Sequence, residues 1–304
     1  MSDINNYDAD DRPLKVVAAR YPLRLLAAFF ALFILLAIVQ SLAINPRWEW
    51  GVFRQWFFDP VILSGLGKTL LLTLLGTLFG IIFGTLLALA RLSKSYLLSA
   101  LAWGYIWLFR SLPLLLVLIV LYNFSYLYDS LSIGIPFTSF EFFRHSTVDL
   151  LDQFSVAVLG LSLVQSAYTA EIIRGGIIGV DHGQQEAAAA LGLPAWRRTF
   201  RIILPQALRA ILPTGFNEVI SLAKGTSIVY VLSMPELFYT VQVIYNRTQQ
   251  VIPLLMVATV WYLLITTVLS VLQYYVERYF SRGAVRHIAP TTLQRLRQWR
   301  TARP

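Results

Sequence analysis

Six long apolar runs dominate the sequence and constrain its fold more than any other feature. They cover roughly residues 23–44, 61–91, 97–128, 153–179, 207–232 and 251–277. Because a helix needs about 20 mostly apolar residues to cross about 30 Å of hydrocarbon, each run is long enough to span a membrane. Of the 304 residues, 57% are hydrophobic and only 13% are charged. The sequence therefore predicts an all-α polytopic membrane protein with six transmembrane helices.

The distribution of lysine and arginine predicts how these helices are oriented. Cytoplasmic loops of membrane proteins carry an excess of both residues. If both termini are cytoplasmic, the inner segments hold 18 of the 25 Lys and Arg residues. The outer loops hold only four, and the other three, Lys68, Arg110 and Lys224, fall at membrane depth. This asymmetry favours two cytoplasmic ends, and it indicates that the net charge of +9 serves membrane topology and not nucleic-acid binding.

Short additions are expected on both sides of one membrane domain. The apolar run 23–44 reads as an uncleaved signal anchor, because it is long enough to span and no small-residue cleavage site follows it. Tryptophan and phenylalanine are frequent in 45–60, which favours an amphipathic segment on the outer membrane surface. The predicted parts are a cytoplasmic tail (1–22), an extra transmembrane helix with an interfacial segment (23–60), the transmembrane domain (61–280) and a basic cytoplasmic tail (281–304).

Two features inside the predicted spans bear on how the helices pack. Gly76, Gly80 and Gly84 form a small-residue stripe on one helix face, which favours close contact with another helix. Pro113 lies within the third run, where it leaves a backbone carbonyl unpaired and can bend the helix.

The composition argues against catalysis by this chain. It has no cysteine and three scattered histidines, so neither a disulfide nor a metal centre is expected. Gly67-Lys68-Thr69 invites comparison with a phosphate-binding loop, but that motif needs glycine at position 62, which is Ile62. No carboxylate pair or nucleophile–base spacing lies near a membrane face. The sequence therefore predicts no catalytic residue, no metal and no cofactor in the chain itself.

One inter-span loop carries a motif at fixed spacing. Glu186-Ala187-Ala188 is followed three residues later by Gly192, and nine further residues separate this glycine from Ile202-Ile203-Leu204-Pro205. Good helix formers fill 184–191, Gly192 permits a left-handed turn, and Pro194 suits the start of a second helix. We expect two short helices at a right angle, the second presenting Arg197, that form a projection able to enter a cleft on another protein. The alternative, an ordinary alanine-rich helix beside a basic stripe, leaves the full spacing unexplained.

This spacing resembles the signature loop of ABC importer permeases. Three further stretches resemble the polar amino-acid uptake family: residues 166–176, Phe109–Leu115 and Lys224–Ser227, although Gly225 stands where that family commonly has aspartate. The likeness covers about residues 61–280, and the run 23–44 is an addition to the family's usual five-span core.

The resemblance implies a type I ABC importer permease fold in a bacterial inner membrane, and transport by alternating access. Two such permeases, identical or paired with a sister subunit, would sit on two ATP-binding subunits that hold ATP and Mg. A solute-binding protein would deliver an amino acid or a close derivative, whose identity the sequence leaves open. Within the coupling loop, 181–205, the residues expected to engage the ATPase are Glu186, Ala187, Ala188, Gly192, Arg197 and Pro205.

Ionisable groups at membrane depth are costly and indicate either a substrate pathway or buried pairs. Glu171 and Arg174 are three residues apart on a helix, so we expect a structural ion pair. An amino acid brings one carboxylate and one ammonium, which opposed charges would satisfy. We expect a midplane cavity formed by Arg110, Asn217, Glu218, Lys224, Thr226 and Ser227. The alternative role of each residue is a polar clamp between helices or subunits.

Two alternative functions explain less of the sequence than an ATP-driven permease does. A secondary transporter driven by an ion gradient needs no ATPase partner, so this function does not explain the motif at residues 186–205. A membrane enzyme lacks any visible catalytic group. The sequence therefore favours an ATP-driven amino-acid importer permease.

Overall fold

The computed structural model describes residues 22–135 and 140–280, so most of the predicted tails, 1–21 and 281–304, lie outside the described residues. The chain divides into two units between Trp48 and Glu49. The first contains helix α1 (Pro22–Ile44) and a 3-10 turn η1 (Pro46–Trp48). Its stretch Leu26–Ile44 has a mean hydropathy of 2.6 and no buried residue, so it is suited to contact lipid along its whole length.

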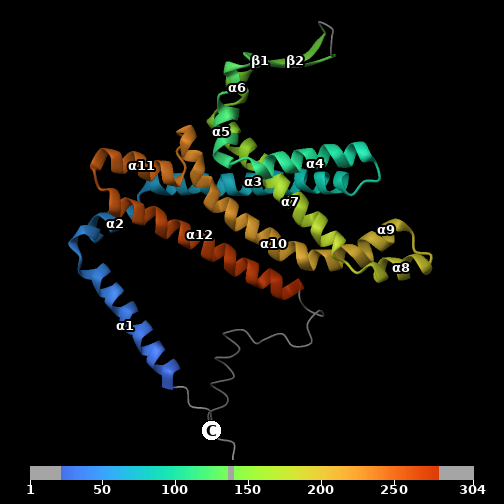
Figure 1. The fold of residues 1–304 in the computed structure, drawn as a ribbon. Coiled ribbons are helices and arrows are strands. Elements are labelled where there is room, and N and C mark those ends of the chain that lie inside the picture. Colours follow the sequence, from blue (N-terminus) through green and yellow to red (C-terminus); the bar gives the residue numbers. More distant parts are fainter. Residues whose placement is uncertain (1–21, 136–139, 281–304) are drawn as a thin grey trace, which may run out of the picture. The chain divides into compact units, whose positions relative to one another are not determined.

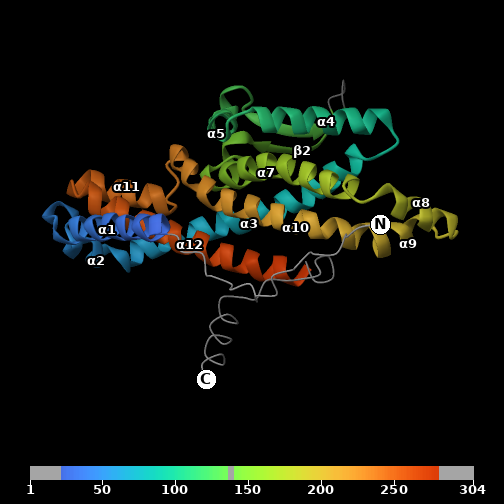
Figure 2. The same cartoon turned by 60° about the horizontal axis from the view of Figure 1, so that its bottom comes forward.

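The second unit is a helical bundle (Figures 1 and 2). Its helices are α2 (Trp50–Phe57), α3 (Pro60–Arg91), α4 (Tyr96–Ser111), α5 (Leu114–Tyr122), α6 (Thr147–Leu150), α7 (Gln153–Ile178), α8 (His182–Ala190), α9 (Ala195–Arg198), α10 (Leu204–Gly225), α11 (Leu237–Thr248) and α12 (Val251–Phe280). Within it α7 packs on α3, α4, α5 and α10, and α12 packs on α10, α11 and α2. At one end α8 and α9 project beyond the other helices (Figure 1).

The candidate membrane spans agree approximately with the predicted six. Four helices are long and apolar enough by themselves, and two bent pairs raise the number to six among the described residues. The third predicted span is bent, as Pro113 indicated: α4 ends at Ser111 and α5 leaves it at 102°. Pro113 is the N-cap residue of α5, and its missing N–H and fixed φ favour a break at this point.

The glycine stripe on α3 packs against α7, as predicted. Gly76, Gly80 and Gly84 are all buried. A Cβ added at Gly84 would lie 2.9 Å from the Ser166 carbonyl oxygen and 2.7 Å from the Thr169 Cβ, both on α7. The two helix backbones therefore approach closely because no side chain separates them.

Two apolar cores flank this contact. One joins α3, α5, α7 and the 3-10 segment η4 (Thr226–Leu232) around Leu72, Leu118 and Leu161. The other joins α3, α11 and α12 around Ile62 and Leu254, and α2 packs onto it. Phe57 of α2 stacks on Trp261 of α12 with the ring centroids 4.8 Å apart, and the Trp261 indole N–H donates to the Phe57 carbonyl at 3.0 Å. The aromatic segment expected at the membrane surface is therefore partly packed on protein.

A two-stranded antiparallel hairpin, which the sequence reasoning did not predict, interrupts the helical fold. Strand β1 (Ser130–Gly134) pairs with β2 (Glu141–Ser146) in a register that joins Leu131 to His145. Every residue of β2 is exposed, and the hairpin contacts α6. It lies between α5 and α7 in the chain, in a connection that the apolar runs left unassigned.

Candidate functional site

The segment 181–205 begins with a well-capped helix and a glycine turn. Asp181 caps α8, because its Oδ1 accepts a hydrogen bond from the Gly183 N–H at 2.6 Å. Gly192 has a φ of 69°, a conformation that costs glycine little and other residues considerably more. After this turn the Leu193 N–H donates to the Ala188 carbonyl at 3.2 Å, which closes the end of α8. The sequence thus folds locally as its motif indicates.

The second helix of this segment differs from the expectation. It is not a separate short helix, because α9 continues through the π-helical turn η3 (Thr199–Ile203) into α10, and the helical run extends from Ala195 to Leu232. Pro205 lies in the first turn of α10, directly after η3. Proline cannot donate to an α-helical ladder, so the wider turn before it lets the helix continue.

The projecting surface of this segment combines apolar and charged side chains. Leu191, Trp196 and Phe200 are 78%, 57% and 64% exposed. The Arg197 guanidinium lies 5.1 Å from the centre of the Trp196 ring. Glu186 is exposed, whereas Ala188 is buried against the segment itself. Exposed apolar groups beside charged side chains are typical of surfaces that bind another protein.

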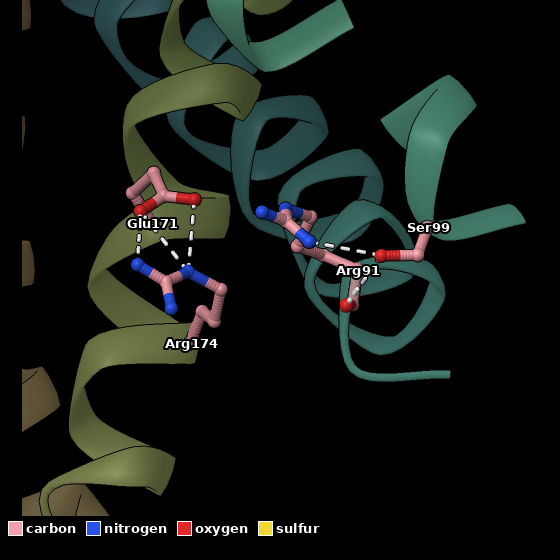
Figure 3. A network of polar contacts seen from close by, with 4 residues as sticks. All are labelled: Arg91, Ser99, Glu171 and Arg174. Atoms are coloured by element: carbon pink, nitrogen blue, oxygen red, sulfur yellow. Dashed lines mark hydrogen bonds and ion pairs between the residues drawn. The ribbon is translucent and has the colours of Figure 1, made fainter. Parts of the chain in front are cut away.

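Glu171 and Arg174 form an ion pair on α7. Arg174 donates through Nε and Nη2 to the Glu171 carboxylate, with the closest nitrogen and oxygen 2.8 Å apart (Figure 3). Arg91 of α3 lies on the neighbouring helix and donates to the Ser99 hydroxyl at 2.9 Å. The charges of Arg91 and Arg110 also act on Glu171 from a greater distance. The hydrogen bond from Arg91 to Ser99 joins the end of α3 to α4, whereas the ion pair lies within α7.

Of the six residues expected to contact substrate, Asn217, Glu218 and Lys224 lie on two faces of α10. Thr226 and Ser227 follow in η4, and Arg110 lies on α4. Asn217 and Lys224 are seven residues apart and share a face, since seven residues make about two helical turns. Asn217 accepts a hydrogen bond from Gln273 of α12 at 3.1 Å. Lys224 and Ser227 line a cavity of about 340 Å³ together with Tyr262 and Thr266. This face of α10 therefore looks toward α12.

The other face of α10 carries Glu218, which is half-buried and acts electrostatically with Arg110 of α4. The Arg110 guanidinium lies 5.5 Å from the centre of the Tyr168 ring on α7. Thr226 is fully buried and its hydroxyl donates to the Ala223 carbonyl at 2.8 Å. Within one chain the six residues thus do not surround one cavity.

Sequence reasoning missed a buried acid at the start of α11. Glu236 is fully buried, and its carboxylate accepts from the N–H groups of Phe238 and Tyr239 at 2.9 and 2.7 Å. The Thr69 and Tyr262 hydroxyls lie 3.3 and 3.2 Å from the same carboxylate. Glu236 therefore caps α11 and joins it to α3 and α12. The available signal was Pro235-Glu236 in front of an apolar run, a pattern typical of a helix start.

Replacing Tyr262 by phenylalanine tests this buried cluster. The change removes one hydrogen-bond donor from the buried Glu236 carboxylate, and such a loss lowers the free energy of unfolding by about 1–3 kcal/mol. We expect a lower midpoint of thermal unfolding for the purified protein in detergent, with no change in subunit composition. Tyr275→Phe, at an exposed position on the same helix, is the control. An equal midpoint for both variants would contradict the role of the cluster.

The fold is that of a polytopic membrane protein, and the segment 181–205 projects from one end of its bundle. The chain matches the family model of binding-protein-dependent transport system inner membrane components over residues 76–282. This match covers more than half of the chain, so the protein belongs to that family.

Individual relatives extend this result. The chain is 35% identical to the arginine transport system permease protein ArgU of Corynebacterium glutamicum, with 97% of this chain and 93% of that protein covered. It is 34% identical to the glutamate/aspartate import permease protein GltK of Escherichia coli O6:H1, covering 72% and 93%. A crystal structure of an amino acid ABC transporter with histidines matches with a TM-score of 0.61 at 33% identity, covering 72% and 94%. The fold is therefore that of an ABC importer permease.

Proposed function

We propose that this chain is the membrane-spanning permease subunit of an ATP-driven importer for amino acids or close derivatives. The observation that carries the proposal is the segment 181–205, which projects from the bundle in a member of the binding-protein-dependent family. The relatives named above carry arginine and glutamate or aspartate in their names, which supports the substrate class. We place the protein in a bacterial inner membrane with both ends cytoplasmic, as the lysine and arginine distribution favours.

The complete importer would contain two ATP-binding subunits, a second permease and a solute-binding protein. In this assembly Glu186, Gly192 and Arg197 would meet the ATPase, and Ala187, Ala188 and Pro205 would shape the surface. Closure of the ATPases would move α8 and α9, and the continuous helix from α9 to α10 would carry that movement to the residues facing the substrate path. ATP and its magnesium ion would be held by the partner subunits.

Substrate would pass along α10. Lys224 and Ser227 line a cavity beside α12, whereas Glu218 lies on another face of α10, where the charge of Arg110 acts on it. Two permeases in one complex would supply two copies of each face. Asn217 and Thr226 already bond within the chain, so we assign them to holding α10 and not to the ligand.

An uptake experiment tests the proposed function. The chain would be purified with its ATP-binding and permease partners, reconstituted in vesicles and supplied with the solute-binding protein. We expect labelled amino acid to accumulate only when ATP is present on the side of the ATPases. Uptake without ATP that follows an imposed proton gradient would contradict the proposal and favour a secondary transporter.

A further inference from the structure

A second hollow lies at the end of the bundle opposite the segment 181–205. It has a volume of about 660 Å³, within the range of about 300–1,000 Å³ that small-molecule sites occupy. Its walls come from the first half of α3, the end of α5, the start of α7 and the connection from η4 to α11. Because α8 follows the far end of α7, this hollow opens on the side from which an importer would receive substrate.

The lining of this hollow carries one cation, Lys68, and one carboxylate, Asp152. No ion pair joins them, and Lys68 has no hydrogen bond to any residue in the described part of the chain. Hydrogen bonds from the side chain and backbone of Ser155 hold the pKa of Asp152 below its usual range, so it is charged at neutral pH. Two opposite charges therefore face one water-accessible space without neutralising each other.

Both charges sit on backbone that other contacts hold in place. Lys68 directly precedes Thr69, whose hydroxyl accepts from the Leu237 N–H at 3.1 Å and lies 3.3 Å from Glu236. Asp152 is the N-cap residue of α7, where its Oδ1 accepts from the Ser155 N–H at 2.8 Å. A site whose backbone is held in place before binding loses less entropy when a ligand arrives.

The remaining lining supplies neutral polar and apolar groups. Asn123 donates through its side-chain nitrogen to the Ile119 carbonyl at 2.8 Å, which leaves its amide oxygen available as an acceptor. Gln153 and Ser125 add further polar atoms, and Leu71 and Phe154 offer apolar surface. The combination suits a small molecule with one positive group, one negative group and a variable side chain.

We propose that this hollow binds a free amino acid, with Lys68 facing the α-carboxylate and Asp152 facing the α-ammonium, before the substrate reaches α10. The inference rests on the proposed function and adds a site on the receiving side. It commits to a small zwitterion because both charges line a single hollow of ligand size. A charged patch for a solute-binding protein is the alternative outcome of the test.

The test measures binding directly, on the assembled importer in lipid nanodiscs without its solute-binding protein. Saturation-transfer NMR would first screen the common L-amino acids and identify the one that binds wild type most tightly. A hydrogen bond to a charged group contributes strongly to binding, so we expect Lys68→Met and Asp152→Asn each to raise Kd about tenfold or more. Asparagine also caps helices well, so the second variant keeps the start of α7 intact.

Two variants at the same end of the bundle serve as matched controls. Arg247→Met removes a cation that lines the neighbouring cavity and not this one. Asp59→Asn makes the same change at the N-cap residue of α3, outside the lining. Both controls are expected to leave Kd unchanged.

Ligand analogues make the assignment of each charge specific. If the α-carboxylate of the ligand is blocked as an amide, binding to wild type should weaken. Binding to the Lys68→Met variant should not weaken further. Blocking the amine by acetylation should likewise have no further effect on Asp152→Asn. This pairing of variant and analogue separates direct contact from a general disturbance of the fold.

The outcomes separate the two proposals. A wild-type complex that takes up amino acids in vesicles, with unchanged binding in both variants, would overturn the site and leave the proposed function standing. The site would also be overturned if the variants weakened only the docking of the solute-binding protein. It would likewise be overturned if blocking a ligand group raised Kd in the matching variant as much as in wild type. A wild-type complex that neither binds nor transports any amino acid would overturn both.

Discussion

Replacing Gly84 by leucine is expected to prevent the bundle from folding correctly. Even a Cβ at this position would meet the Ser166 carbonyl oxygen at 2.9 Å, and a backbone atom of a packed helix cannot move aside cheaply. Overpacking a core lowers the free energy of unfolding by about 1–3 kcal/mol and occasionally more. A leucine is severe in this respect because it adds three carbons beyond the Cβ. We expect aggregation or loss of the monodisperse peak when membranes are solubilised and the protein is followed by size-exclusion chromatography.

The same helix offers a control and a graded series. Gly67 has no atom within 4 Å of an added Cβ, so Gly67→Leu should fold like wild type. Among alanine substitutions at the three glycines of the stripe, Gly76→Ala should destabilise the fold least, because the nearest atom to its Cβ is a leucine methyl at 3.2 Å. Gly84→Ala should be more severe. Equal behaviour of Gly84→Leu and Gly67→Leu would show that α3 and α7 are not in contact as described.

Changing Glu186 to lysine is expected to abolish ATP-driven uptake while the fold survives. Glu186 is exposed on α8, so the substitution should alter stability by no more than about 0.5 kcal/mol. If the carboxylate is paired with a cation of the ATPase, its loss costs about 2–5 kcal/mol at the interface, and the new charge adds repulsion. We expect co-purification of the ATP-binding subunit to fall at least tenfold.

Gln184→Lys is the matched control for that experiment. It places the same lysine on the same exposed helix, two residues away and therefore on the opposite face. This variant should keep both the ATP-binding subunit and uptake. If the two variants behave alike, charge on α8 in general matters and Glu186 has no particular role.

Much of the fold could be predicted because membrane insertion imposes strong rules on the sequence. Apolar length located the spans, and the glycine stripe indicated a close helix contact on α3, which the structure makes with α7. The motif at Glu186–Pro205 indicated the projecting segment, and its glycine at position 192 adopts the left-handed conformation that the motif favours.

Other features could not be predicted because they depend on contacts between distant segments. Pro113 indicated a bend in the third span, but the sequence does not give its angle of 102°, since both halves are apolar. Opposed charges placed Lys224 and Glu218 in one predicted cavity, whereas the helix directs them to different neighbours: Lys224 lines a cavity with α12, and Glu218 is influenced by Arg110 of α4. Lys68 and Asp152 are separated by more than 80 residues, so only the folded chain brings them to one hollow.

The two ends of the segment 181–205 differ mechanically. On one side α7 stops at Ile178, and three residues with no helical continuity lead to α8. On the other side the helix runs from Ala195 to Leu232 without a break. The segment is therefore joined to α7 by three residues outside any helix, 179–181, and to α10 by helical backbone. Because Lys224 and Glu218 both lie on α10, any movement of this helix shifts both charges together.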